Sequence, residues 1–342
     1  MDNSFISIQQ TIKLVFVTVN SFDCTVIGDI FLDIIVKVNG DYKRFFRGGT
    51  SYCNFAKAVL GGSGNVAAGL STIGGTTAFV GKAGYDFFGK LYLRNLKEKG
   101  VFTKVFFDER SPTGLILVLV EDGKQRSFLV FRGANDKLSP DEIEKTTSLI
   151  RRSHYLYFSG YSLVNKPQRN AILKAVDLAR KFKVNIVFDP GAVNLIRSER
   201  TLFTRLVDSC DVFSPNLEEA CAITRVGNTD DVVDLLRKKN PLTTLKCDRN
   251  GCIIISKDRV VRVPGYNVKC VDPTGAGDAF TAGVIYGLSR KLPYKSIGQL
   301  GNWFAAEVVS SIGPRSFPTK TKIDHFLKRL HIETAAKTST IN

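Results

Sequence analysis

Short apolar runs of strand length alternate with stretches of helical periodicity through most of this chain of 342 residues. In the helical stretches apolar side chains recur at i, i+3 or i+4, as in Ile172, Ala175 and Ala179. Repeats of strand, helix and strand predict a parallel sheet with helices on both faces. We therefore expect one doubly wound α/β domain rather than two smaller ones. The expected buried strands are 24–28, 77–80, 155–159, 185–188, 212–214, 243–246 and 252–256.

Two segments break this rhythm and read as consecutive strands, one at about 31–52 and the other at about 101–132. Their expected turns are Asn39-Gly40, Ser111-Pro112 and Asp122-Gly123. We expect these strands to form a small β-sheet apart from the main one. Because open α/β folds bind ligands at the carboxyl edge of the sheet, strands that leave the domain and return are expected to form a lid there. The alternative is a second part of an ordinary core sheet.

The string DPTGAGD at residues 272–278 runs directly into a helical pattern. Gly275 and Gly277 flank the small Ala276, so three successive backbone N–H groups can turn toward one point at a helix N-terminus. This arrangement predicts an anion site. Asp278 is unfavourable beside an anion unless it takes a proton from a hydroxyl that attacks a bound phosphate, which is the task of a kinase base. The alternative is a glycine-rich turn in which Asp278 caps the helix.

A second glycine-rich string, LGGSGNVAAG at residues 60–69, opens another helix of small residues. Glycines let a ligand approach the backbone closely, and the amide of Asn65 can both donate and accept hydrogen bonds. These are the requirements of polyhydroxyl recognition, although a tight turn with an N-cap is an alternative. The string GDIFLD at 28–33 precedes it and GKAGYDFFG at 81–89 follows it.

Together these strings resemble the two signatures of the ribokinase (PfkB-type) family of sugar and nucleoside kinases, with DPTGAGDAF as the second signature. The resemblance covers roughly residues 23–330. It implies a ribokinase-like three-layer α/β/α fold with a doubly wound, mostly parallel sheet and a small β-sheet lid. Residues 1–22 are then an N-terminal extension of unknown order, and residues 331–342 are a C-terminal tail. An added strand or a mis-assigned start codon would also account for the extension.

The resemblance also implies roles for residues that match the motifs. Asp278 would be the base, and Gly275, Ala276 and Gly277 would form the anion hole. The residues implied to hold substrate hydroxyls are Asp33, Gly61, Gly62 and Asn65. Arg132, at the expected return from the lid, would meet a substrate carboxylate or, as the alternative, face solvent at a strand end.

The nucleotide side follows from further matches. Asn216 and Glu219 match an N-x-x-E motif that places Mg²⁺ and phosphate, with Glu219 acting through water. Lys246 is expected to reach phosphate as a point charge, and Gly251 closes the same loop. In that loop Asp248 stands where family members usually carry a glycine, which puts the nucleotide preference in question. The residues implied to lie beside the adenine are Asn302, Ala305 and Ala306.

The function that the resemblance implies is in-line transfer of the γ-phosphoryl of ATP to a hydroxyl of a small sugar, whether pentose, hexose or sugar acid. ATP and Mg²⁺ are the implied cofactors, and a monovalent cation is left open. A nucleoside kinase on the same scaffold is the alternative. From other classes, a silent sugar sensor would require a damaged base or anion hole, and a basic nucleic-acid-binding protein would show strongly salt-dependent affinity for DNA or RNA.

Charge and cysteine content bear on partners and compartment. The chain has 48 Lys and Arg against 32 Asp and Glu, a net charge of +16, but the basic residues are spread along helical patterns as on solvated faces. We therefore expect no specific nucleic-acid partner. No apolar run reaches the length of about 18 residues that a membrane span needs. Seven scattered cysteines without a C-x-x-C pair favour a reducing cytoplasm. The apolar lid strands favour a homodimer through the lid, with a monomeric lid as the alternative.

Overall fold

The computed structural model describes residues 21–38, 48, 50, 52–120, 126–191, 193–239 and 241–339. Its main sheet has nine strands in the order β13-β12-β11-β10-β9-β8-β1-β4-β5. All neighbours in it are parallel except that β12 runs antiparallel to both β11 and β13. The strands are β1 (Phe22–Ile27), β4 (Thr77–Gly84), β5 (Phe102–Asp108), β8 (Ser153–Ser159), β9 (Asn185–Asp189), β10 (Val212–Phe213), β11 (Leu242–Lys246), β12 (Cys252–Ile255) and β13 (Val260–Val263).

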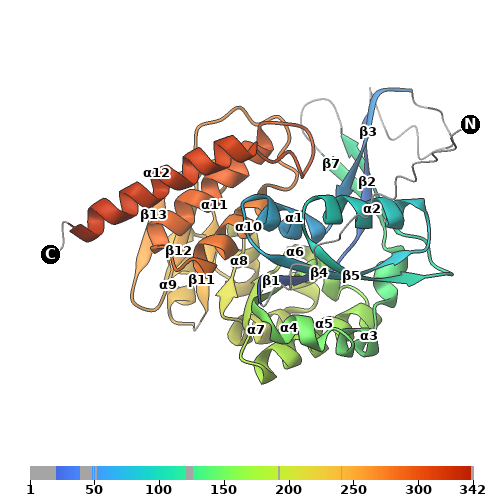
Figure 1. Ribbon diagram of the computed structural model, residues 1–342, viewed down its shortest axis with the longest axis horizontal. Helices are drawn as coiled ribbons and strands as arrows, with labels where there is room; N and C mark the ends of the chain where they lie inside the picture. Colours follow the sequence, from blue (N-terminus) through green and yellow to red (C-terminus); the bar gives the residue numbers. More distant parts are fainter. Residues whose placement is uncertain are drawn as a thin grey trace, which may run out of the picture.

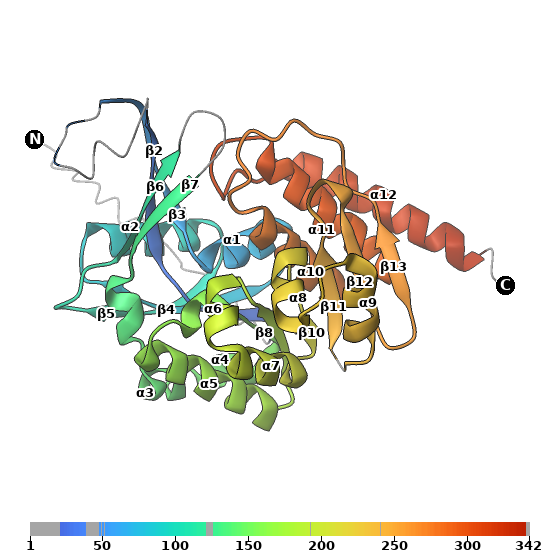
Figure 2. The same cartoon turned by 180° about the vertical axis from the view of Figure 1, so that it is seen from behind.

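Helices cover both faces of this sheet, which gives three layers. One face carries α1 (Gly64–Thr72), α2 (Phe87–Glu98), α10 (Ala276–Ser289), α11 (Tyr294–Val309) and α12 (Lys320–Ser339) (Figure 1). The other face carries α3 (Pro140–Glu144), α4 (Thr147–Arg151), α5 (Lys166–Lys181), α6 (Val193–Ser198), α7 (Arg200–Ser209), α8 (Leu217–Thr224) and α9 (Thr229–Arg237) (Figure 2). Each of the seven strands expected from apolar runs is present, so the predicted doubly wound α/β architecture is confirmed.

The apolar periodicity has the expected physical origin. Ile172, Ala175 and Ala179 of α5 are all buried, and they face strands β8 and β9 rather than solvent. Phe158 of β8 and Phe188 of β9 stack beneath them with ring centroids 5.0 Å apart. Burial of one stripe of each helix on a sheet that is apolar on both faces stabilises the layers.

A separate sheet of four strands has the order β3-β2-β6-β7 (Figure 1). Its strands are β2 (Phe31–Val38), β3 (Cys53–Gly61), β6 (Gly114–Val120) and β7 (Arg126–Phe131). β2 pairs in parallel with β6, and the outer two pairings are antiparallel. β1 ends at Ile27 and the chain enters β2 at Phe31, so this small sheet rises from the carboxyl edge of the main sheet. The predicted small sheet is thus present.

Two details of the lid prediction are wrong. The strand at Phe102–Asp108 belongs to the main sheet, because it follows α2 and pairs in parallel with β4 as the end of a βαβ crossover. Consequently Ser111-Pro112 connects the main sheet to the lid instead of turning a hairpin within it. The second lid strand, Cys53–Gly61, lies beyond the expected segment 31–52. The turns expected at Asn39-Gly40 and Asp122-Gly123 fall outside the described residues.

Helix α12 runs across the boundary expected at residue 330 and continues to Ser339. In the part of the chain that the structure describes, no helix has both the length and the apolar character of a membrane span.

Candidate active site

The turn before α10 has the backbone that the glycine pattern predicts. Gly275 is the N-cap of α10 with φ of 81°, and a Cβ there would come within 2.6 Å of the Cα of Pro314. Glycine is therefore required by both conformation and space. Asp278 lies in the first helical turn, and no side chain of the described residues caps this N-terminus. Asp278 is thus not the helix cap, which removes the alternative interpretation of this residue.

The carboxylate of Asp278 is held by a side chain from the other glycine motif. Nδ2 of Asn65, in α1, donates a hydrogen bond of 2.9 Å to Oδ2 of Asp278. The pKa of Asp278 is raised to about 6, because burial and Asp189 raise it by more than Asn65, Lys246 and Arg315 lower it. A carboxyl group with a pKa near 6 is ionised at neutral pH and is a stronger base than an ordinary aspartate.

Asp33 lies in β2 on the lid side of the same region, with 8% of its surface exposed. A Cβ on Gly61 would lie 2.3 Å from Oδ2 of Asp33, so only glycine fits beside this carboxylate. Among the described residues, Oδ1 of Asp33 has no hydrogen-bond partner. Burial raises the pKa of Asp33 to about 7, opposed by Arg315 and assisted by Asp278. A buried polar atom without a partner needs a donor, which a hydroxyl ligand would supply.

Gly62 and Arg132 both lie beside Asp29. Gly62 has φ of 76°, and a Cβ there would lie 2.4 Å from the carbonyl oxygen of Asp29, so it forms the turn into α1. Arg132 pairs through Nη2 with Oδ1 of Asp29 at 2.8 Å and through Nε with Oδ1 of Asp136 at 2.6 Å. Only 11% of its side chain is exposed, so the solvent-facing alternative is wrong. A role for Arg132 toward a substrate carboxylate stays a prediction.

Lys246 ends β11 beside the anion turn. Its Nζ lies 3.6 Å from the place of a Cβ on Gly277 and forms an ion pair of 2.8 Å with Oδ2 of Asp189. Burial alone would lower the pKa of Lys246, but Asp189 and Glu219 raise it. Lys246 is therefore a firmly protonated cation next to the predicted anion hole.

Asn216 and Glu219 form a capping box at the start of α8. The backbone N–H of Glu219 donates to Oδ1 of Asn216, and the backbone N–H of Asn216 donates to Oε2 of Glu219, both at 2.8 Å. Oε1 of Glu219 also accepts from Nδ2 of Asn216 at 2.8 Å. Because both oxygens of Glu219 already accept hydrogen bonds, this carboxylate fits a metal held through water better than one bound directly. The described residues contain no group of three or more His, Cys, Asp or Glu side chains placed to hold a metal.

The residues expected near the adenine lie on α11 and its neighbours. Nδ2 of Asn302 donates to the carbonyl oxygens of Val263 and Pro264, at 3.1 and 3.0 Å, so this amide holds the exit of β13. Ala305 is half-buried and Ala306 is buried on the same helix. These contacts place Asn302 as a support of the loop after β13, and direct adenine contacts stay a prediction.

The departure at Asp248 has a conformational explanation. Asp248 has φ of 49° and Gly251 has φ of 94°, so both positions keep a left-handed backbone. Aspartate is among the few residues that tolerate this conformation without glycine. A Cβ on Gly251 would lie 2.2 Å from the carbonyl oxygen of Val263, so the loop is packed closely against β13.

Three residues of this region were not singled out in the sequence. Asp189 ends β9, where a polar residue at a strand's carboxyl end was the available signal. Arg126 of lid strand β7 pairs through Nη2 with Oδ1 of Asp272 at 2.8 Å, which ties the lid to the loop before the anion turn. Arg315 follows α11, and its Nε donates to Oδ1 of Asn65 at 2.9 Å. Neither arginine lies in a recognisable motif.

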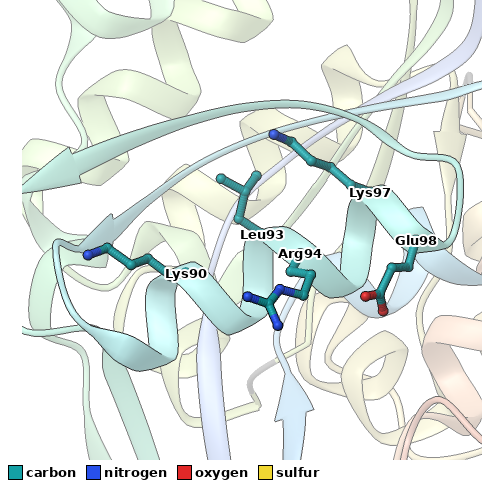
Figure 3. Close-up of a pocket in the computed structure, with 5 residues that line it drawn as sticks. All are labelled: Lys90, Leu93, Arg94, Lys97 and Glu98. Atoms are coloured by element: carbon teal, nitrogen blue, oxygen red, sulfur yellow. The ribbon is translucent and has the colours of Figure 1, made fainter. Parts of the chain in front are cut away.

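Two surface hollows lie apart from this site. One of about 340 Å³ lies on the outer side of α2, where Lys90, Leu93, Arg94, Lys97 and Glu98 project from the helix (Figure 3). The other, of about 490 Å³, is lined by Asp234, Arg237, Lys238 and Lys257. Both are lined by long side chains and contain none of the residues grouped around Asp278, so they do not carry the chemistry.

Comparison with known proteins decides the family. Residues 22–322 match the family described as pfkB family carbohydrate kinase. The chain belongs to this family. Fructokinase-2 of Oryza sativa subsp. japonica is 31% identical over 243 residues, which cover 69% of this chain and 72% of that protein. A 5-dehydro-2-deoxygluconokinase of Geobacillus kaustophilus is 29% identical over 298 residues, covering 83% and 88%.

Solved structures confirm the ribokinase-like fold. The adenosine kinase of Sinorhizobium meliloti superposes with a TM-score of 0.81 at 24% identity, over 90% of this chain and 99% of that one. An uncharacterized sugar kinase from Pyrococcus horikoshii in complex with ATP gives a TM-score of 0.73 at 26% identity, over 87% and 96%. The family and the fold predicted from the two signatures are confirmed, and this PfkB-family protein is an ATP-dependent carbohydrate kinase.

Proposed function

We propose that this carbohydrate kinase transfers the γ-phosphoryl of ATP in line to a sugar hydroxyl with Asp278 as the base, and without a covalent enzyme intermediate. One observation carries the proposal. A carboxylate whose pKa is raised to about 6 lies in the first turn of the helix capped by Gly275, where it accepts a hydrogen bond from Asn65 and is acted on by the charge of Lys246. A base, an anion site and a cation at one point are what phosphoryl transfer to a hydroxyl requires.

Each part of the site has its own task in this mechanism. Asp278 accepts the proton of the attacking hydroxyl, while the backbone N–H groups of Gly275, Ala276 and Gly277 stabilise charge on the transferred group. Lys246 adds positive charge beside this turn. A positioned base contributes about 10²–10⁴ in rate, or roughly 3–5 kcal/mol, so the anion site and water exclusion by the lid supply the remainder.

Mg²⁺ is the proposed metal, and Glu219 with Asn216 would hold it through water. When bound, it would neutralise phosphate charge and help to orient the triphosphate. Glu219 is buried and Asn216 is partly buried, so the capping box holds the carboxylate in place without using it in a direct metal bond. We assign no residues to a monovalent cation.

The proposed acceptor is a neutral sugar whose hydroxyls are held by Asp33 and Asn65, with the backbone at Gly61 and Gly62 close by. The orphaned Oδ1 of Asp33 supports this choice, because a polyol supplies several donors to one carboxylate. A nucleoside is the second candidate, since its ribose presents hydroxyls too and an adenosine kinase shares the fold.

The decisive experiment is a coupled assay of ADP release by the purified full chain. The panel comprises pentoses, hexoses, sugar acids, inositol and nucleosides, each with ATP and Mg²⁺. We expect Mg²⁺-dependent turnover with at least one sugar that exceeds turnover with every nucleoside. Folded protein that is silent across the panel would contradict the kinase mechanism, and a nucleoside as best acceptor would overturn the sugar assignment alone.

We further propose a homodimer that pairs lid against lid in the cytoplasm. Phe128, Leu129, Val130 and Phe131 of β7 are each about half exposed, which leaves an apolar strand at the edge of the small sheet. All seven cysteines are free thiols, which fits a reducing compartment. Light scattering at high protein concentration tests the dimer, and a monomer would reject it.

A further inference from the structure

Arg315 lies in the segment between α11 and α12 and contacts two helices behind Asp278. Its Nε donates to Oδ1 of Asn65 at 2.9 Å, and its Nη1 donates to Oδ1 of Asn95 at 2.6 Å. Its guanidinium lies over the ring of Tyr92, 4.7 Å from the centroid. The guanidinium is therefore clamped on three sides, by α1 through Asn65 and by α2 through Asn95 and Tyr92.

The contact with Arg315 determines how the amide of Asn65 is oriented. A guanidinium only donates hydrogen bonds, so the Asn65 atom that it contacts must be the carbonyl oxygen. The NH₂ group of the same amide then faces Asp278, and Nδ2 donates to Oδ2 at 2.9 Å. With the amide reversed, two oxygens would face each other at Asp278 and two donors would face each other at Arg315. Arg315 therefore selects the orientation in which Asn65 supports an ionised carboxylate.

Tyr92 connects the contacts of Arg315 to the proposed sugar site. The hydroxyl of Tyr92 donates to the carbonyl oxygen of Gly61 at 2.8 Å, and Gly61 lies against the carboxylate of Asp33. A Cβ on Gly64 would lie 3.0 Å from Nη2 of Arg315, so α1 approaches the guanidinium as closely as glycine allows. One arginine thus joins the supports of both carboxylates.

We propose that Arg315 is a positioning residue of the phosphoryl transfer, which holds Asn65 so that its amide donates to Asp278, and which Asn95 and Tyr92 hold in turn. The inference rests on the proposed role of Asp278 as the base. In this proposal Arg315 acts through Asn65 and not through its own contact with the sugar or the nucleotide.

Charges around the site agree with this geometry. Burial raises the pKa of Asp278 and of Asp33, and in both cases the charge of Arg315 lowers it. Lys246 also lowers the pKa of Asp278, but it is already paired with Asp189. The titratable and charged groups that act on Asp278, or are acted on by it, are Asp33, Asp189, Lys246, Arg315, Tyr157 and Tyr161. Of these two cations, only Lys246 would remain without Arg315 to counter the effect of burial on the pKa of Asp278, and Lys246 is shared with Asp189.

The test is the pH profile of kcat/KM for Arg315→Met, measured on the full chain with ATP, Mg²⁺ and the panel sugar that the parent phosphorylates fastest. We expect the acidic limb of this profile, where kcat/KM falls with decreasing pH, to shift to higher pH by about one unit. The reason is that loss of the neighbouring arginine raises the pKa of the Asp278 carboxylate. A loss of about 10-fold in kcat should persist at pH 8.5, because a misplaced Asn65 is not restored by ionisation. The KM for ATP should change less than about twofold.

Two further variants separate positioning from charge and from stability. Arg315→Lys keeps a cation but cannot reach the amides of both Asn65 and Asn95. It should therefore return the acidic limb of the profile to its parental pH and leave most of the loss in kcat. Arg290→Met is the matched control, because Arg290 pairs with Asp23 at the far end of α10, with 2.7 Å between Nη1 and Oδ1. It should lower Tm and leave the pH profile unchanged.

An unmoved limb with parental kcat in Arg315→Met would overturn the inference. A loss that matches Arg290→Met in both Tm and kcat would overturn it too, because it would show a structural role alone. If Arg315→Met does not fold, Asn95→Leu removes only the outer anchor, and an unchanged profile in that variant is equally decisive. An active Asp278→Asn would refute the base itself, whereas an inactive one beside an unaffected Arg315→Met refutes this inference alone.

Discussion

Replacing Asp278 with asparagine removes a charge and a proton acceptor while keeping nearly the same volume. The new amide oxygen can still accept from Nδ2 of Asn65, and α10 keeps its N-cap, which is Gly275. The substitution therefore tests the base without rebuilding the site. We expect kcat to fall at least about 10²-fold, since an amide cannot take the proton of the attacking hydroxyl.

The same substitution should stabilise the fold at neutral pH. Burial raises the pKa of Asp278 from 3.8 to about 6, so the native state binds more protons than the unfolded chain between these two values. The contribution of the protonated form is present below about pH 4 and is lost as the pH rises through about 6. Ionised Asp278 then costs the native state about 3 kcal/mol at pH 7. Asp278→Asn should recover part of this and melt higher at pH 7, with the gain shrinking toward pH 4.

The assay combines turnover, ATP binding by titration calorimetry and thermal melting at both pH values. ATP affinity should stay level or improve, because a charge that repels phosphate is lost. Asp23→Asn is the matched control: burial raises the pKa of Asp23, but hydrogen bonds from Arg290 and Thr76 lower it below its ordinary value. That control should lose stability at neutral pH and keep its turnover. An Asp278→Asn variant with near-parental kcat would refute the catalytic assignment.

Three other measurements test neighbouring parts of the site. Lys246→Met removes the cation beside the anion turn and should weaken ATP binding by about 10-fold or more, measured by calorimetry; parental affinity would contradict its role. Asp33→Asn should raise the sugar KM by about 10-fold or more in substrate saturation curves, because hydrogen bonds to a charged group are lost, and should leave the KM for ATP unchanged. In the parent, kcat/KM should fall by at least about tenfold per pH unit below pH 6, since ionised Asp278 is required and the pKa of the sugar-binding Asp33 is raised as well; a flat profile from pH 5 to 8 would argue against this base.

The elements that sequence patterns predicted well are those whose signals are local. Apolar runs and helical periodicity located the strands and helices of the main sheet, including α5 with its buried stripe. The strand Phe102–Asp108 is predicted in the lid because it precedes the lid strand β6 in the chain, and a strand pattern does not name the sheet that the strand joins. Only its partner β4 decides that it completes the main sheet.

The site residues also fall into those that local sequence predicts and those that depend on tertiary contacts. Gly275 and Asp278 could be predicted because the left-handed turn and the helix that follows it depend on adjacent residues. The burial of Arg132 could not be predicted, because it depends on Asp29, which lies 103 positions away in the chain.

The sequence by itself determined the layered architecture, the two glycine turns and the carboxylate at the start of α10, because each depends on the conformation of neighbouring residues. The tertiary structure alone decided that Arg315 supports Asn65, across 250 positions of chain, and that Arg126 of the lid meets Asp272, across 146. An arginine has the same local preferences on a solvated surface as in a clamp. What distinguishes these two is the set of acceptors that packing brings within hydrogen-bond distance, and no spacing along the chain encodes that set.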